Sequence, residues 1–449
     1  MDSSLRQRPA AAKGNALPVE AARIGVLRLH PKPLLPHGRE NRIPFEAEIA
    51  SALLLSIYLS LAACVFCCLS GGKWTFIQGF YFCSVTLTTV GYGDFTPPAS
   101  VAARLLTVAF IWNNVLIVSA VLGILGSRIE QEIVRGCDLI SGSSVPVKLS
   151  NHMSVLGLFI LFSAFGFSFL EGRSFLDGIY FTTVSLSTVG YGCVVPTSDK
   201  TRALTCPVLL VGVVSVGNIT GFLANWLKGR WACQGWAKRR RSRIGVSLLV
   251  TATAALMGGI AISQASGEAW SLHECLYFAM MTITTVGYGD FTPVHSETTK
   301  LLAVLFIWSS VTVVAVLLGF IGEAEEALVG AALDRDKLCL GRTRCLRRFA
   351  AAYKDRGPSG YFLVFVGLQF LSSFIFAVLE SWTLVDSFYF TAVTLTTVGY
   401  GDMIPASLVG KQAATLLALV GVPLTTALVS TLSCRFTQDL VHKIEELDK

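Results

Sequence analysis

One seven-residue motif occurs four times in this chain and limits what the chain can fold into. It reads TTVGYGD at residues 88–94, 284–290 and 396–402, and STVGYGC at 187–193. Each copy is flanked by apolar stretches. Because self-similarity of this kind marks an internally repeated protein, the fold has to give four loops similar surroundings.

The composition predicts that these loops lie in a membrane. Of the 449 residues, 53% are hydrophobic and only 14% are charged, whereas a soluble domain carries about 25% charged residues. Residues 1–45 are polar and basic, without a short apolar core and cleavage site. We therefore expect an integral membrane protein that begins with a cytosolic tail rather than a secretory signal peptide.

Eight apolar stretches are long enough to cross a bilayer, because about 20 helical residues span the hydrocarbon core. They are 49–69, 105–125, 152–170, 203–227, 244–262, 301–321, 361–379 and 413–432. Within each successive pair lies a further apolar segment that is too short to span. Non-helical backbone at membrane depth must be enclosed by protein or line a water-filled cavity, so we expect re-entrant half-helices, each followed by an extended glycine-containing turn. The predicted fold class is all-α, with eight transmembrane helices and four re-entrant helices.

Basic residues fix the expected orientation. Residues 228–243 carry seven Lys or Arg and no acid. By the positive-inside rule, both termini and the linkers between repeats are cytosolic, and the motif loops open to the far side. The run KRRRSR at 238–243 could also bind anionic membrane lipid, although such runs more often only fix topology.

The expected segments are a basic tail (1–47), pore repeats 1 to 4 (48–127, 152–227, 244–322 and 360–433), linkers (128–151, 228–243 and 323–359) and a tail (434–449).

The four repeats fall into two classes. TLTTVGYGDFTP at 86–97 resembles TITTVGYGDFTP at 282–293, whereas SFLDGIYFTTVSLSTVGYG at 174–192 matches TLVDSFYFTAVTLTTVGYG at 383–401. Repeats 1 and 3 therefore form one class, and repeats 2 and 4 the other. The simplest origin is a two-repeat unit duplicated in tandem.

The motif suits the binding of a dehydrated cation. Glycine reaches backbone dihedral angles that other residues resist, so four such loops around one axis could turn stacked rings of carbonyl oxygens inward. Rings of this kind replace the hydration shell of potassium, and several weak sites in series let ions displace one another. The predicted selectivity-filter residues are Thr89, Val90, Gly91, Tyr92, Gly93, Thr188, Val189, Gly190, Tyr191, Gly192, Thr285, Val286, Gly287, Tyr288, Gly289, Thr397, Val398, Gly399, Tyr400 and Gly401.

These four motifs resemble the signature sequence of potassium channels. The short connection near Gly71 to Thr75 makes the chain similar to tandem-pore potassium channels of plant type, and the resemblance extends from residue 48 to 432. It implies passive, potassium-selective conduction of leak or outward type. Members of that superfamily build one pore from four loops, so this chain is expected to be a monomeric pseudo-tetramer, with its four re-entrant pore helices and filter loops pseudo-fourfold around one pore. No metal beyond permeant potassium, no other cofactor and no nucleic acid partner are expected.

Several positions around the motif recur in register. Tyr81, Tyr180, Tyr277 and Tyr389, each followed by phenylalanine, stand ten residues before the first glycine of GYG. They could form an aromatic cuff around the filter or simply pack a helix.

Gly72, Glu171, Glu268 and Glu380 stand nineteen residues before that glycine. The acids could hold the filter from behind, but we favour a role at the positive end of the pore helix, where Asp177, Glu274 and Asp386 could act in the same way.

The residue after the motif is expected at the outer mouth. Asp94, Asp290 and Asp402 would concentrate cations there, while the second repeat has Cys193. Cys193 could be a modifiable thiol or a product of neutral drift. Possible hinge or cavity residues stand twenty-two positions after the glycine, at Asn113, Gly212, Ser309 and Gly421, although small residues also ease helix contact in membranes.

Other features of the sequence bound the function. No span has arginine at every third position, so no voltage sensor is expected, and no nucleophile–base pattern suggests an enzyme. The twelve cysteines form no disulfide or zinc pattern, although Cys339 and Cys345 share one basic linker. A four-repeat potassium transporter and a non-conducting channel subunit remain the alternatives. The expected location is the plasma membrane, or otherwise a vacuolar or other endomembrane.

Overall fold

The computed structural model describes residues 45–114, 117, 145–233, 253, 256–267, 270–293, 296–312, 358–425 and 428. The chain divides into two compact units, Met1–Ile49 and Ala50–Lys449, and the second contains all four motifs. Regular secondary structure in the described ranges is helical. The predicted lipid-binding run at 238–243, Glu268 and the pair Cys339 and Cys345 lie outside these ranges.

Each repeat contributes three helical segments to the described part of the chain. The first segments are α1 (Phe45–Leu69), α4 (Val145–Glu171), residues 256–266 and α11 (Pro358–Leu379). The short middle segments are α2 (Phe76–Leu87), α5 (Phe175–Leu186), α8 (Leu272–Ile283) and α12 (Leu384–Leu395). The last segments are residues 101–114, α6 (Asp199–Cys233), residues 297–312 and residues 408–425.

The short middle helices begin and end where local chemistry requires. Thr75, Ser174, Ser271 and Thr383 are their N-cap residues, and each side chain accepts a hydrogen bond from the backbone N–H three residues on, which satisfies one of the free amides of the first turn. Each helix has 12 residues, or about 18 Å of rise. This length is too short to cross a bilayer, as the sequence predicts.

Three helical segments among the described residues are long and apolar enough to span a membrane: Met153–Glu171, Asp199–Gly217 and Leu408–Thr425. On α4, the side chains of Leu158, Phe162, Phe165 and Phe169 are exposed. Their spacing places them along one side of the helix, as expected for a surface that faces lipid.

Four helices extend beyond the predicted repeats. Helix α1 begins at Phe45, inside the expected tail 1–47, and α11 begins at Pro358, inside the expected linker 323–359. Helix α4 begins at Val145, inside the expected linker 128–151, and α6 continues to Cys233, inside the expected linker 228–243. A hydropathy window marks the apolar part of a helix and misses polar turns that extend beyond it.

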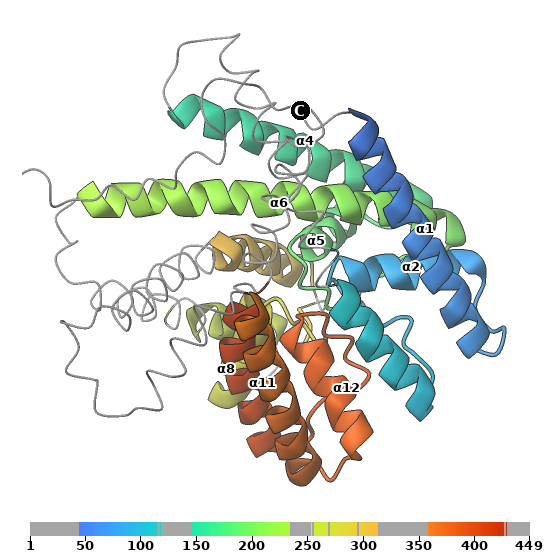
Figure 1. Ribbon diagram of the computed structural model, residues 1–449. Helices are drawn as coiled ribbons and strands as arrows, with labels where there is room; N and C mark the ends of the chain where they lie inside the picture. The colour runs from blue at the N-terminus through green and yellow to red at the C-terminus, as the bar shows by residue number, and fades with distance from the viewer. Residues whose placement is uncertain are drawn as a thin grey trace, which may run out of the picture. The chain divides into compact units, whose positions relative to one another are not determined.

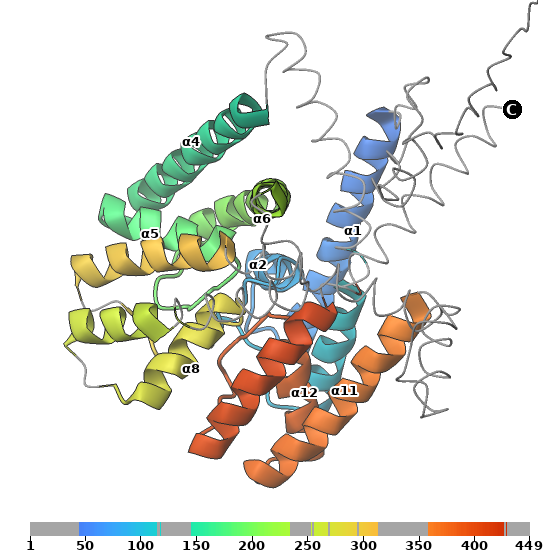
Figure 2. The same ribbon diagram turned by 90° about the vertical axis from the view of Figure 1, so that its left-hand side faces the viewer.

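The helices pack within repeats and between them. Within the second repeat, α4 packs against both α5 and α6, and in the fourth α11 lies beside α12 (Figure 1). Helix α2 of the first repeat also packs against α6 of the second (Figure 2). One buried core joins Tyr92 and Tyr191 with Phe278, which come from three different repeats. The middle helices are thus packed between repeats.

Candidate functional site

The four motif loops form a closed ring. A Cβ built on the first glycine of each GYG would overlap the valine carbonyl oxygen of the preceding repeat: Gly91 with Val398, Gly190 with Val90, Gly287 with Val189, and Gly399 with Val286. The second glycines repeat the pattern with tyrosine carbonyls: Gly93 with Tyr400, Gly192 with Tyr92, Gly289 with Tyr191, and Gly401 with Tyr288. Each repeat therefore touches the next in one rotational sense, and the fourth touches the first.

The backbone of each loop is fixed from the side of the middle helix. The amides of Val90 and Gly91 both donate to the carbonyl of Val85, at 3.0 and 3.4 Å. The same pair of bonds occurs in the other repeats, to the carbonyls of Val184, Met281 and Val393. Two amides per loop are thus turned toward the helix, and the valine carbonyl oxygens lie against the neighbouring loop.

The loop threonines adopt a backbone conformation that the sequence does not predict. Thr89, Thr188, Thr285 and Thr397 have φ of 59, 59, 58 and 60°, in the left-handed region. β-Branched residues rarely adopt such angles, and a residue held there costs about 1–3 kcal/mol. Its occurrence at the same position in all four repeats indicates that the surrounding contacts impose it.

Aromatic side chains brace the ring from outside. Each loop tyrosine shares a hydrogen bond with a hydroxyl on the middle helix of the next repeat: Tyr92 with Ser185, Tyr191 with Thr282 (2.5 Å), Tyr288 with Thr394 (2.5 Å) and Tyr400 with Thr86. Each also stacks on a phenylalanine of that helix, Phe181, Phe278, Phe390 or Phe82, at 5.6–5.7 Å between centroids. Of the two interpretations left open by the tyrosine–phenylalanine pairs, this geometry favours an aromatic cuff.

The tyrosines of the middle helices contact the residue after the motif. The hydroxyl of Tyr389 donates to Asp402 Oδ2 at 2.9 Å, and Tyr180 lies 3.2 Å from the sulfur of Cys193. Cys193 therefore occupies the place of the aspartate in contact as well as in sequence. Its half-buried thiol is free, as are the other described cysteines.

Burial raises the pKa of the Asp94 carboxyl to about 6, although nearby Arg202 lowers it in part. Burial also raises the pKa of the Asp290 and Asp402 carboxyls, because a carboxylate loses hydration when enclosed. These groups are consequently closer to protonation at neutral pH than ordinary aspartates.

The candidate hinge positions separate into two kinds. A Cβ on Gly212 would overlap Leu186, and one on Gly421 would overlap Leu395; both leucines end middle helices. These glycines thus make room for close helix packing. The side chains of Asn113 and Ser309 are exposed.

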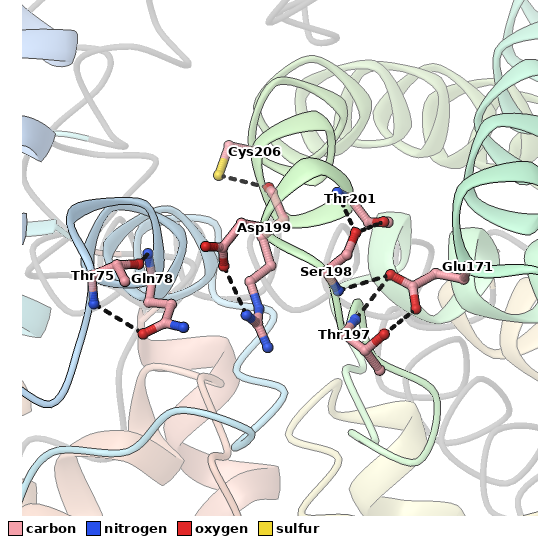
Figure 3. A network of polar contacts seen from close by, with 9 residues as sticks. Thr75, Gln78, Glu171, Thr197, Ser198, Asp199, Thr201 and Cys206 are labelled. Atoms are coloured by element: carbon pink, nitrogen blue, oxygen red, sulfur yellow. Dashed lines mark hydrogen bonds and ion pairs between the residues drawn. The ribbon is translucent and has the colours of Figure 1, made fainter.

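The structure contradicts both interpretations of the acids at the end of the first helix. The carboxylate of Glu171 accepts hydrogen bonds from Thr197 N (2.9 Å), Thr197 Oγ1 (2.5 Å) and Ser198 N (3.2 Å), at the beginning of α6 (Figure 3). Glu380 caps residues 408–425 through Ala406 N, Ser407 N and Ser407 Oγ. Each acid thus ties the first helix of its repeat to the last, rather than to the filter or the middle helix. The spacing of these acids in the sequence does not predict these contacts, because the partners are backbone amides twenty-six residues away.

Replacing Glu380 by glutamine is expected to lower the unfolding free energy by about 1–2 kcal/mol, because three hydrogen bonds to a charged acceptor at a helix N-terminus are weakened. A melting curve of the purified protein in detergent measures this. Asp199→Asn is the control: 42% of the Asp199 side chain is exposed, so loss of its ion pair to Arg202 should matter little. Equal melting temperatures for Glu380→Gln and the parent would contradict the capping role.

Four repeats of apolar helices around a closed ring of loops define the class of this protein: an integral membrane ion channel. Residues 53–131, 154–229, 245–326 and 363–438 each match the family described as Ion channel. These matches cover more than half of the chain, so the chain belongs to this ion channel family, which is not a family of enzymes.

The curated relatives are two-pore potassium channels. The chain is 36% identical over 143 residues to Two pore potassium channel a of Oryza sativa subsp. japonica, covering 31% of this chain and 40% of the relative. It is 33% identical over 144 residues to Two-pore potassium channel 1 of Arabidopsis thaliana, covering 31% and 39%. It is 32% identical over 130 residues to human Potassium channel subfamily K member 17, covering 27% and 39%. The matched region spans about two fifths of these relatives.

Proposed function

We propose that this chain is a potassium-selective channel that conducts passively through a filter made of its own four TVGYG loops. The observation that carries the proposal is the closed ring, in which valine and tyrosine carbonyl oxygens of each loop lie against the glycines of the next. Such stacked oxygens can replace the hydration shell of potassium. The middle helices end beside the ring, so their negative ends favour a cation there.

The proposal extends to the surroundings of the filter. The eight apolar stretches cross the membrane, and one chain completes one pore as a monomer. Asp94, Asp290 and Asp402 place negative charge around the outer mouth, with Cys193 as the uncharged member. Exposed Asn113 and Ser309 line the cavity. Both termini are cytosolic by the charge rule, and the plasma membrane is the proposed location, with an endomembrane as the alternative.

The test is the reversal potential of the purified protein in planar bilayers under opposed potassium and sodium gradients. A potential close to the potassium equilibrium value, with unitary current steps, supports the channel. Sodium-dependent potassium uptake into vesicles without unitary currents would instead identify a four-repeat transporter. Absence of both, in protein whose melting transition is intact, would favour a non-conducting subunit.

Acidification of the outer solution is expected to reduce inward potassium current. With a pKa of about 6, the Asp94 carboxyl is mostly ionised at about pH 7.5 and mostly protonated at about pH 5. Protonation removes negative charge that concentrates cations at the mouth. Unitary conductance at the two pH values measures the effect.

In the same recordings, Asp94→Asn should lower conductance at the higher pH and shrink the pH-dependent change. A parent conductance that is independent of outer pH would contradict this role of the carboxylates. Lys200→Gln, which changes an exposed charge outside the motif, is the control for a general effect of surface charge.

A further inference from the structure

Four basic side chains near the beginning of the last helices form a second ring. They are Arg104, Arg202, Lys300 and Lys411, which follow the first glycine of GYG by 12 or 13 residues. Each reaches the repeat before its own: Arg104 contacts repeat 4, Arg202 repeat 1, Lys300 repeat 2 and Lys411 repeat 3. The ring therefore bridges all four interfaces.

The bridges alternate between two kinds. Arg104 pairs with Asp386, and Lys300 Nζ lies 2.6 Å from Asp177 Oδ1. Arg202 instead lies over the ring of Phe95, at 4.9 Å from the centroid, and Lys411 over that of Phe291, at 4.8 Å. Ion pairs thus join repeats 4 to 1 and 2 to 3, and cation–π contacts join 1 to 2 and 3 to 4. At the interface of repeats 4 and 1, Arg104 also lies over the ring of Tyr389, at 5.7 Å from the centroid.

The two repeat classes explain this alternation. In repeats 2 and 4 the third residue of the middle helix is aspartate, Asp177 or Asp386. In repeats 1 and 3 it is Gln78 or Glu274, whose longer side chain folds back onto the backbone of its own N-cap residue in a capping box. The phenylalanine after GYGD occurs only in repeats 1 and 3.

The two ion-pair interfaces are not equivalent. At the first, Arg104 has a second carboxylate nearby: the Arg104 guanidinium lies 5.7 Å from the ring centroid of Tyr389, whose hydroxyl donates to Asp402. Its charge accordingly lowers the pKa of the Asp402 carboxyl against the effect of burial. At the second, the corresponding residue is Cys193, which offers Lys300 no negative charge. Among the described residues, Asp177 is the one carboxylate of repeat 2 that pairs with Lys300; Glu297 lies on the same helix as Lys300, at 3.5 Å, with 64% of its side chain exposed.

The Asp177–Lys300 pair is also well placed to position the loops. Only 15% and 13% of the two side chains are exposed, so removal of one partner leaves a charge that is poorly hydrated. Asp177 lies in the first turn of α5, which supports the loop of repeat 2 through the carbonyl of Val184. Lys300 lies on the helix that follows the loop of repeat 3.

We propose that Asp177 and Lys300 are positioning residues that hold filter loops 2 and 3 in register, and that this one pair compensates for the aspartate missing at position 193. The equivalent interface divides the same task between Asp386 and Asp402. The inference rests on the proposed potassium channel function only for its conduction readout, because the interface itself can be tested by stability.

The test compares Asp177→Asn with its matched variant Asp386→Asn. We expect Asp177→Asn to lower the potassium-to-sodium permeability ratio by about tenfold and to lower the melting temperature. Asp386→Asn should have a clearly smaller effect on both, because Arg104 retains Asp402. Equal effects of the two variants would overturn the proposal.

A second-site change makes the test specific. Adding Cys193→Asp to Asp177→Asn returns a carboxylate to the vicinity of Lys300 and should recover most of the lost permeability ratio and melting temperature. A general packing defect at Asp177 would not be repaired in this way, so failure of recovery would overturn the proposal. If Asp177→Asn does not fold, the test uses the double variant Asp177→Lys with Lys300→Asp, which exchanges the two charges. The double variant should fold, whereas Asp177→Lys alone should not.

These results are separable from the proposed function. If the parent carries no potassium current, the channel proposal fails, but the melting temperatures of the same variants still decide the ion-pair proposal. If the parent conducts and Cys193→Asp does not rescue Asp177→Asn, only the ion-pair proposal fails.

Discussion

Replacing Gly190 by alanine is expected to abolish selective potassium current, with at least about a hundredfold loss of potassium conductance. Gly190 has φ of +57°, and an added Cβ would overlap the carbonyl oxygen of Val90 in the neighbouring loop. Because backbone atoms on both sides are held, one loop must move and the ring of oxygens must open. Planar-bilayer recordings of the variant and the parent, at matched protein amounts, measure the loss.

Gly157→Ala is the matched control, because a Cβ at this position in α4 meets no atom within 4 Å. It should leave conductance unchanged and slightly favour the helix. Selective current in Gly190→Ala comparable to that of the control would contradict the proposed position of this loop in the conduction path.

Replacing Tyr191 by alanine should have the second-largest effect. The side chain is buried, stacks on Phe278 of the next repeat and shares a hydrogen bond with Thr282. Truncation of a buried aromatic residue costs about 3–5 kcal/mol, and here it also removes a contact that fixes the diameter of the ring. We expect a large fall in melting temperature and loss of discrimination between potassium and sodium.

Tyr191→Phe separates the two contributions. The phenylalanine keeps the stacking contact and loses only the hydrogen bond, at a cost of about 1 kcal/mol. Its melting temperature should lie close to that of the parent and its selectivity between those of the parent and Tyr191→Ala. Indistinguishable behaviour of the two variants would mean that the hydroxyl alone, rather than the aromatic ring, holds the neighbouring loops together.

The sequence predicts the architecture well where periodic signals are strong. The four short helices before the motifs appear as expected, because each has a cap residue, an apolar body and an end set by the motif. The recurrence of a tyrosine–phenylalanine pair on each middle helix suggests an aromatic cuff. Only coordinates distinguish it from ordinary helix packing, because they show each phenylalanine of these pairs stacked on a loop tyrosine of the preceding repeat.

Contacts between residues that are far apart in the sequence cannot be predicted from such patterns. Nothing in the spacing of Glu171 shows that its partners are the amides of Thr197 and Ser198. The left-handed conformation of Thr89 is also hidden, because threonine has no local preference for it and the neighbouring loops impose it. The partner of Lys300 depends on the order of repeats around the ring, which a linear sequence does not state.

Because the ring is closed by four loops of one polypeptide, each repeat can carry a substitution that the other three repeats do not. In a channel of four identical subunits, one substitution of the residue after the motif changes four positions around the mouth. In a dimer of tandem repeats, it changes two. Cys193 removes a single carboxylate and leaves Asp94, Asp290 and Asp402 in place. With these residues at the outer mouth, as proposed, covalent linkage allows the charge of the entrance to be adjusted in steps of one. A change at position 193 can then be compensated within the same repeat, at Asp177.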